Sequence, residues 1–178
     1  NRIVGTALPI VSGAEHAEEG VRLVERALFE LDPLHPPFQY LSLAYPLYFA
    51  GRHAEAVAAL ERVPDPWLEA RVMPALSYAQ AGMMEQAREQ VQEIFKLEPG
   101  FSGEAWVDND IYEPGGSSAR LFFAGARKAG LPLCTPASEA AKLAPLNLLP
   151  ECDAPRARQA GGWPLRSRAS QPTKQARP

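Results

Sequence analysis

Residues 47–56 read Leu-Tyr-Phe-Ala-Gly-Arg-His-Ala-Glu-Ala, and residues 78–87, 31 positions further along the chain, read Tyr-Ala-Gln-Ala-Gly-Met-Met-Glu-Gln-Ala. The pair Ala-Gly recurs at Gly51 and Gly82, and an alanine follows five residues after each glycine. Self-similarity with a period of about 20–50 residues is typical of proteins that stack one structural unit on the next. The two segments therefore predict a stacked repeat, an architecture that usually serves as a binding surface.

Each copy of the repeat has the pattern of two helices joined by a glycine turn. Gly51 suits the left-handed conformation that ends many helices, which other residues adopt only at a cost. The apolar residues that follow it recur at helical spacing, and charged residues occupy the opposite face. Prolines at 64, 66 and 99 close the second helices, because proline cannot continue a helix. A degenerate third copy precedes these two, with its first helix expected over residues 3–13.

The two full copies resemble the tetratricopeptide repeat, whose pattern of small, aromatic and proline positions spans about 34 residues. The matching residues are Tyr40, Leu43, Ala44, Leu47, Ala56, Leu60 and Pro66 in one copy, and Arg71, Pro74, Ala75, Tyr78, Ala87, Val91 and Pro99 in the next. The resemblance implies an all-α fold in which tetratricopeptide-like helical hairpins stack as a short right-handed solenoid. The repeats are expected over about residues 3–33, 37–66 and 68–99.

Two prolines are unusual inside the expected first helices, and a further helix completes the expected domain. Pro46 and Pro74 fall inside first helices, where each removes a backbone hydrogen bond at a cost of about 3 kcal/mol unless a kink relieves it. A capping helix over about 118–130 should cover the last hairpin, giving a repeat domain over 1–132. Residues 133–178 are rich in proline and arginine and are expected to form a mostly disordered tail, in which only a short helix over 137–144 is considered.

Four short segments narrow the family resemblance. They are Leu31-Asp32-Pro33 followed by residues 35–40, residues 47–52, residues 99–102 and residues 127–132. In this order they resemble the C-terminal repeat region of bacterial class III adenylate/guanylate cyclases, over about residues 14–132. In that family the repeats follow a cyclase domain, often with an ATPase-like module between them. This chain contains no cyclase domain, so no metal-binding or substrate-binding residue is carried over. Related repeats also occur in bacterial transcriptional regulators.

Charge and motif content limit the chemistry that the chain is expected to perform. Residues 1–150 carry 12 Lys and Arg against 19 Asp and Glu, and residues 151–178 carry 6 against 2. The acidic body argues against nucleic acid as a partner, and no apolar run is long enough for a membrane span. No catalytic, cofactor-binding or metal-ligating residue is predicted. Cys134 and Cys152 are interpreted as free thiols in a reducing cytoplasm.

The first helices of the repeats are expected to line a concave face that holds a partner. The candidate residues on this face are Phe38, Leu41, Tyr45, Tyr48, Phe49, Val72, Leu76 and Gln80. Aromatic anchors of this kind are enriched at protein interfaces. The alternative is that these side chains pack against the upstream helix or the capping helix.

The sequence thus predicts a non-catalytic, cytoplasmic helical-repeat scaffold without cofactor. Its partner is expected to be a protein or peptide, or an upstream domain of the same polypeptide, with no role for nucleic acid or membrane. The parent is expected to be a bacterial cyclase-type signalling protein. Two alternatives stay open: a fragment of a nucleotide cyclase whose catalytic domain is missing, and the repeat region of a transcriptional regulator.

Overall fold

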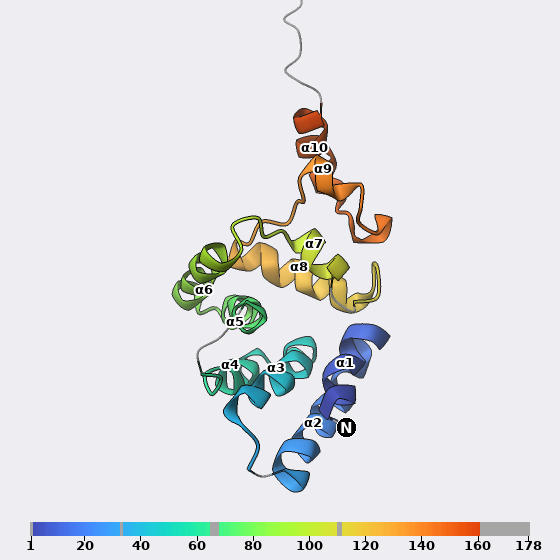
Figure 1. Cartoon of the computed structure of the whole chain (residues 1–178). Helices are drawn as coiled ribbons and strands as arrows, with labels where there is room; N and C mark the ends of the chain where they lie inside the picture. Colours follow the sequence, from blue (N-terminus) through green and yellow to red (C-terminus); the bar gives the residue numbers. More distant parts are fainter. Residues whose placement is uncertain (1, 33, 65–67, 110–111, 161–178) are drawn as a thin grey trace, which may run out of the picture.

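The computed structural model describes residues 2–32, 34–64, 68–109 and 112–160, and all the regular structure within these ranges is helical (Figure 1). The expected all-α class is therefore confirmed. The first six α-helices pack as three successive pairs: α1 (Arg2–Ser12) with α2 (Ala17–Glu25), α3 (Tyr40–Phe49) with α4 (His53–Leu60), and α5 (Glu69–Gln80) with α6 (Met84–Leu97). Three short elements connect them: η1 (Ala14–His16), the π-helical turn η2 (Arg26–Leu31) that extends α2, and η3 (Pro37–Gln39).

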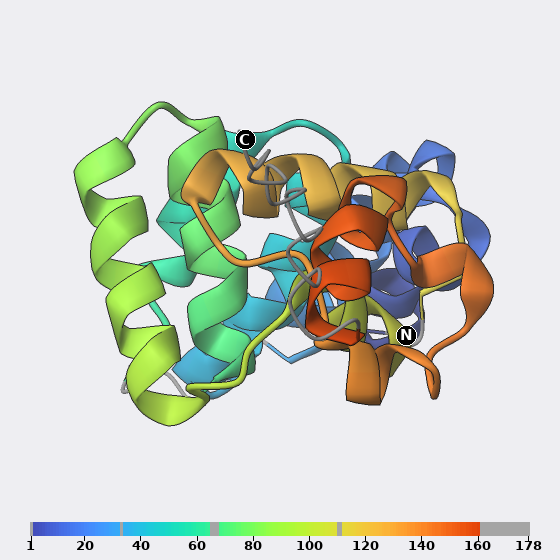
Figure 2. The same ribbon diagram turned by 90° about the horizontal axis from the view of Figure 1, so that it is seen from above.

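The second half of the chain covers one side of these pairs. It comprises α7 (Gly103–Asn109), α8 (Ser117–Ala129), α9 (Ala137–Ala140), η4 (Pro145–Asn147), η5 (Pro150–Cys152) and α10 (Asp153–Ala160). The helix expected over about 118–130 is α8, and it packs mainly on α5, with further contacts to α6, α7 and α1. Seen from above, α8 crosses the helix pairs, and α9 and α10 lie on its outer side (Figure 2).

The recurring glycines end three helices with the same hydrogen-bond pattern. Gly51, Gly82 and Gly130 have φ values of 76°, 83° and 86°. At the first turn the Arg52 N–H donates to the Leu47 carbonyl (2.9 Å), and at the second the Met83 N–H donates to Tyr78 (2.8 Å). This six-to-one bond satisfies a carbonyl that the helix end would otherwise leave unpaired. The Ala-Gly repeat in the sequence is therefore a repeat of helix-ending turns.

Prolines inside the first helices are accommodated by contacts with neighbouring helices. Pro9, Pro46 and Pro74 lie within α1, α3 and α5, and all three are buried. Pro46 has no N–H to offer the carbonyl of Ser42 one turn earlier, and the Thr6 hydroxyl of α1 donates to that carbonyl instead (3.0 Å). Burying an unpaired carbonyl costs about 1–3 kcal/mol, so the α1–α3 contact offsets part of the cost of this proline.

One continuous apolar core runs through the helix pairs and under α8. At its centre the Tyr48 hydroxyl of α3 donates to the Leu121 carbonyl of α8 (3.0 Å). Gly125 allows this approach, because a Cβ at that position would lie 2.0 Å from the Tyr48 hydroxyl oxygen. A glycine on α8 thus sets how closely this helix packs on the pairs beneath it.

Residues 131–160, which we call the C-terminal clasp, fold back onto α7 and contradict the expected boundary at residue 132. The side chain of Glu104 is completely buried and accepts hydrogen bonds from the backbone N–H groups of Thr135 and Leu149, both at 2.7 Å. One turn later Asp108 accepts from the N–H of Ala144 (2.7 Å) and the side-chain amide of Asn147 (3.0 Å). Two carboxylates of α7 therefore order a segment whose proline content had predicted disorder. The remaining part of the predicted tail, residues 161–178, lies outside the described residues.

The two cysteines form a disulfide, contrary to the expectation of free thiols. Cys134 and Cys152 are 18 residues apart in sequence, and their Cα atoms lie 5.3 Å apart, within the range that a disulfide spans. The folding of the clasp onto α7 brings them together. Spacing along the sequence gave no indication of this contact, because it depends on the path of the whole clasp.

Candidate functional site

Most of the predicted partner-binding residues are buried in the core, so the expected concave face is not an open surface. Tyr48 is 2% exposed, and Tyr45 and Phe49 beside it are buried as well. Val72 and Leu76 of α5 are fully buried. Two of them contact α8: the Tyr48 hydroxyl donates to the Leu121 carbonyl, and Leu76 would lie 3.1 Å from a Cβ placed on Gly125. The prediction that these five residues form an open face is wrong, and the alternative of packing against the upstream helix or the capping helix describes Tyr48 and Leu76, which contact the capping helix.

The other three predicted residues retain some exposure but do not share one surface. Phe38 is 49% exposed, at the entry to α3. Leu41 is half-buried and packs against the core. Gln80 is also half-buried, and the Lys128 ammonium lies 3.3 Å from its carbonyl and 3.4 Å from its side-chain oxygen. Only Phe38 is available as a hydrophobic contact for a partner.

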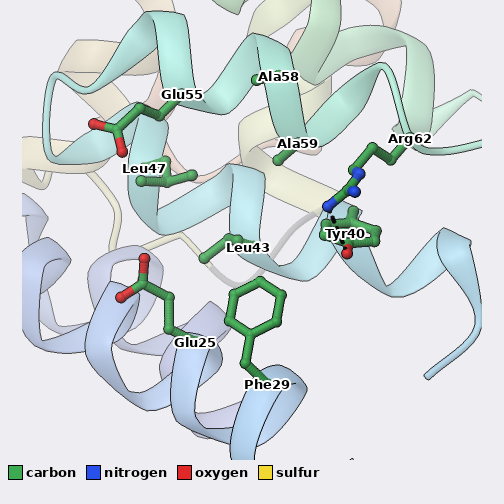
Figure 3. Close-up of a pocket in the computed structure, with 9 residues that line it drawn as sticks. All are labelled: Glu25, Phe29, Tyr40, Leu43, Leu47, Glu55, Ala58, Ala59 and Arg62. Atoms are coloured by element: carbon green, nitrogen blue, oxygen red, sulfur yellow. Dashed lines mark hydrogen bonds between the residues drawn. The ribbon is translucent and has the colours of Figure 1, made fainter. Parts of the chain in front are cut away.

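An open groove of about 390 Å³ lies instead between η2 and the α3–α4 pair. Its lining residues are Glu25, Phe29, Tyr40, Leu43, Leu47, Glu55, Ala58, Ala59 and Arg62 (Figure 3). Leu43 and Leu47 of α3 and Ala59 of α4 are buried and form its floor, whereas Phe29 projects from η2 and is 50% exposed. The groove therefore offers an apolar strip that solvent still reaches.

Charged side chains of opposite sign stand at the two ends of the groove. Glu25 and Glu55 lie at one end, and Arg62 lies beside Tyr40 at the other (Figure 3). The Arg62 guanidinium stacks 4.5 Å from the centre of the Tyr40 ring and donates to the Tyr40 hydroxyl (2.7 Å). Cation–π stacking and this hydrogen bond together fix an otherwise long and exposed cation.

Arg52 organises the acidic end. It donates two hydrogen bonds to Glu55 (2.7 and 2.6 Å) and a longer one to Glu18 (3.4 Å). Hydrogen bonding to Glu55 raises the pKa of Arg52, and the same contact lowers the pKa of the Glu55 carboxyl. Glu25 is close enough to contribute to the field at Arg52. Three carboxylates thus surround a single guanidinium.

Further exposed apolar side chains lie on the connection between η2 and α3, near in sequence to Phe29 and Tyr40 of the groove. Leu31, Leu34 and Phe38 are 65%, 93% and 49% exposed, and His35 packs its ring against Phe29 and Tyr40. We call the exposed side chains of Phe29, Leu31, Leu34 and Phe38 the apolar rim. Sequence reasoning selected Phe38 but missed the others. The signal that could have identified them is the presence of large apolar residues within a proline-rich connection.

Tyr48 and His53 lie close together, a contact that the sequence did not indicate. The His53 ring is half-buried and lies 5.3 Å from that of Tyr48. Burial, and to a smaller extent the charge of Lys128, lowers the pKa of His53, and burial raises the pKa of Tyr48. These shifts disfavour both charged forms, as expected for groups packed at the junction of α3, α4 and α8.

Two further observations concern metals and membranes. Within the described ranges, no three His, Cys, Asp or Glu side chains are grouped so as to hold a metal ion. In the same ranges, no helix has both the length and the apolar composition that crossing a membrane requires.

Comparison of the chain with protein-family models, with curated proteins and with solved structures found no match. The function proposed below therefore rests on the residues of this chain.

Proposed function

We propose that this chain is a non-catalytic helical-repeat scaffold that binds a protein or peptide, or an upstream domain of the same polypeptide. The observation that carries the proposal is the groove between η2 and the α3–α4 pair, together with the exposed apolar rim on the connection between these elements. Contiguous exposed apolar side chains with polar groups around them mark protein interaction sites. Stable folding alone gives no reason to leave Phe29, Leu34 and Phe38 in water.

The finer architectural assignment, tetratricopeptide-like hairpins in a short right-handed solenoid, belongs to the same proposal. It is supported by three consecutive helix pairs and by the identical turns at Gly51 and Gly82. Unlike the concave face expected from the sequence, the binding surface proposed here lies on the side of α3 and α4 that η2 approaches.

The parent protein is proposed to be a bacterial cyclase-type signalling protein, as the resemblance of the repeat segments implies. A nucleotide cyclase fragment and the repeat region of a transcriptional regulator are the alternatives. The coding sequence upstream of Asn1 separates them, because it encodes a cyclase domain, a DNA-binding domain or neither. The chain itself should show no cyclase turnover with Mg²⁺ or Mn²⁺, and measurable turnover would overturn the non-catalytic assignment.

A site-specific photo-cross-linker tests the binding function. Ala58 is exposed and lines the groove, whereas Ala54, one turn earlier on α4, is exposed outside it. A cross-linking residue at position 58 should form a discrete adduct in cells that produce the full chain, and the same residue at position 54 should not. Equal adducts at both positions, or none at position 58, would contradict a partner bound in the groove.

Cytoplasmic location stays a prediction, and the Cys134–Cys152 disulfide counts against it. Disulfides persist mainly in oxidising compartments. We therefore expect that the oxidation state of Cys134 and Cys152 in the isolated chain will decide between the cytoplasm and an oxidising compartment.

A further inference from the structure

We infer that the groove binds a peptide segment that carries a large apolar side chain next to a lysine or arginine. This inference rests on the protein-binding function proposed above and adds the chemistry of the partner. The groove floor supplies the apolar contact: Leu43 and Ala59 are buried beneath it, and half of the Phe29 side chain is exposed at its wall. An aromatic or long aliphatic side chain placed between them would remove this surface from water.

At the acidic end of the groove, carboxylates outnumber the one guanidinium that lies among them. Glu18, Glu25 and Glu55 surround Arg52, whose three hydrogen bonds go to Glu55 and Glu18. Among the described residues, Glu25 takes part in no salt bridge. The carboxylates therefore exceed the single guanidinium among them, and a basic side chain of the partner would complement this end.

The opposite end fixes the direction of the bound segment. Arg62 donates one N–H to Tyr40 and stacks on its ring, and because a guanidinium carries five N–H donors, others can bind an incoming group. An acidic side chain or a terminal carboxylate of the partner fits there. The basic residue of the peptide should thus lie toward Glu25 and its acidic group toward Arg62, with the apolar side chain between them (Figure 3).

This distribution of charge and apolar surface selects a peptide over a nucleic acid. A polyanion would meet Glu25 and Glu55 over the same apolar floor, and only Arg62 of the lining residues would attract it.

Selection from a library of short random peptides, displayed on phage and panned on the oxidised full-length chain, tests the inference. Enriched peptides should combine an aromatic or large aliphatic residue with a neighbouring Lys or Arg. Their binding should weaken by about tenfold or more with Glu25→Lys, which turns the attraction for the basic residue into repulsion. Glu19→Lys is the matched control, because Glu19 is exposed on the same helix and does not line the groove.

A larger side chain inside the groove provides a second test, which does not depend on charge. Ala58→Gln should abolish binding of the enriched peptides, and Ala54→Gln on the same helix should leave it unchanged. Both positions are exposed, so circular dichroism should confirm that the variants fold. Peptides that lack a basic residue, or that bind Glu25→Lys as well as the original chain, would overturn the inference. If peptides are enriched but tolerate both groove variants, the binding function survives and its assignment to the groove falls. If no peptide is enriched, both the binding function and its assignment to the groove are wrong.

Discussion

Glu104 of α7 and Arg156 of α10 form an ion pair, in which one guanidinium nitrogen lies 2.9 and 2.8 Å from the two carboxylate oxygens of a side chain with no exposed surface. The Arg156 side chain is 10% exposed, and its second terminal nitrogen donates to Asp153 (2.8 Å). The same Glu104 carboxylate also accepts the two backbone N–H groups that position the clasp. One buried charge therefore holds residues 131–160 against the helical body.

Replacing Glu104 should release the clasp. Glu104→Gln removes the buried counter-charge of Arg156 and leaves it only the exposed Asp153, and removing one partner of a buried pair costs about 3–5 kcal/mol. Urea denaturation should show this loss, with little change for Glu113→Gln at an exposed position. A double variant, Glu104→Leu with Arg156→Leu, should be less destabilised than the sum of its single changes. Full additivity of the two single changes would contradict a direct pair.

The disulfide should contribute separately to the stability of the clasp. Closing a loop of 18 residues is worth about 3 kcal/mol in the chain-entropy account. Cys152→Ser, or a dithiol reductant added to the original chain, should therefore lower the denaturation midpoint. Alkylation before reduction should label neither cysteine in the isolated protein. Two labelled thiols in freshly isolated, folded chain would show that the bond does not form in the producing cell.

Close packing of α8 on α3 should make Gly125 intolerant of a side chain. A Cβ there would meet the Tyr48 hydroxyl oxygen at 2.0 Å, so Gly125→Ala should destabilise the fold by about 1–3 kcal/mol despite the better helix propensity of alanine. Tyr48→Phe removes the clashing oxygen, so the double variant should lose less than the sum of the single changes. Thermal unfolding measures all four proteins of this cycle, and a stabilising Gly125→Ala would contradict the packing.

The helix-ending glycine at position 51 should be required for its backbone conformation alone. A Cβ at Gly51 would meet nothing within 4 Å, but its φ of 76° lies in the left-handed region. Gly51→Ala should therefore cost about 1–2 kcal/mol, and Gly51 replaced by D-alanine through semisynthesis should not. Gly100→Ala, at an exposed glycine without a positive φ, is the control and should be close to neutral. Equal effects at both positions in denaturation experiments would refute this account.

His53 should make stability depend on pH. Burial places its folded-state pKa below the reference value of 6.5, so the folded state favours the neutral ring. The contribution of the neutral His53 ring to stability is complete above pH 6.5. It is lost as the pH falls through 6.5 toward the lower folded-state pKa. The free energy of unfolding should accordingly decline on mild acidification, and His53→Gln should reduce this slope. An unchanged slope in the variant would assign the dependence to other groups.

Helices and turns were predictable because their causes are local. The repeats expected over about 37–66 and 68–99 contain the pairs α3–α4 and α5–α6, and Gly51 and Gly82 marked the turns within them. Proline content was misleading for residues 131–160. A proline-rich composition indicates that a segment can bury little apolar surface on its own. It gives no information about the carboxylates of α7 that bind this segment.

Burial could not be predicted from the same local patterns. Tyr48 looks like part of an open aromatic face in the sequence, and the contact with α8 that covers it joins residues 73 positions apart. The groove has the same origin, since α2 and η2 bring Glu25 and Phe29 next to Leu43, Ala59 and Arg62.

The amino-acid pattern alone specified an all-helical chain, paired helices and glycine turns, because each depends on backbone preferences and on spacing within one or two helical turns. Tertiary structure decided which faces are covered, where a partner can bind and how the clasp is held. The contact between Glu104 and Arg156 spans 52 residues of sequence. Such a contact forms only when intervening helices have packed, because desolvating two charges is favourable only where the fold supplies their partners.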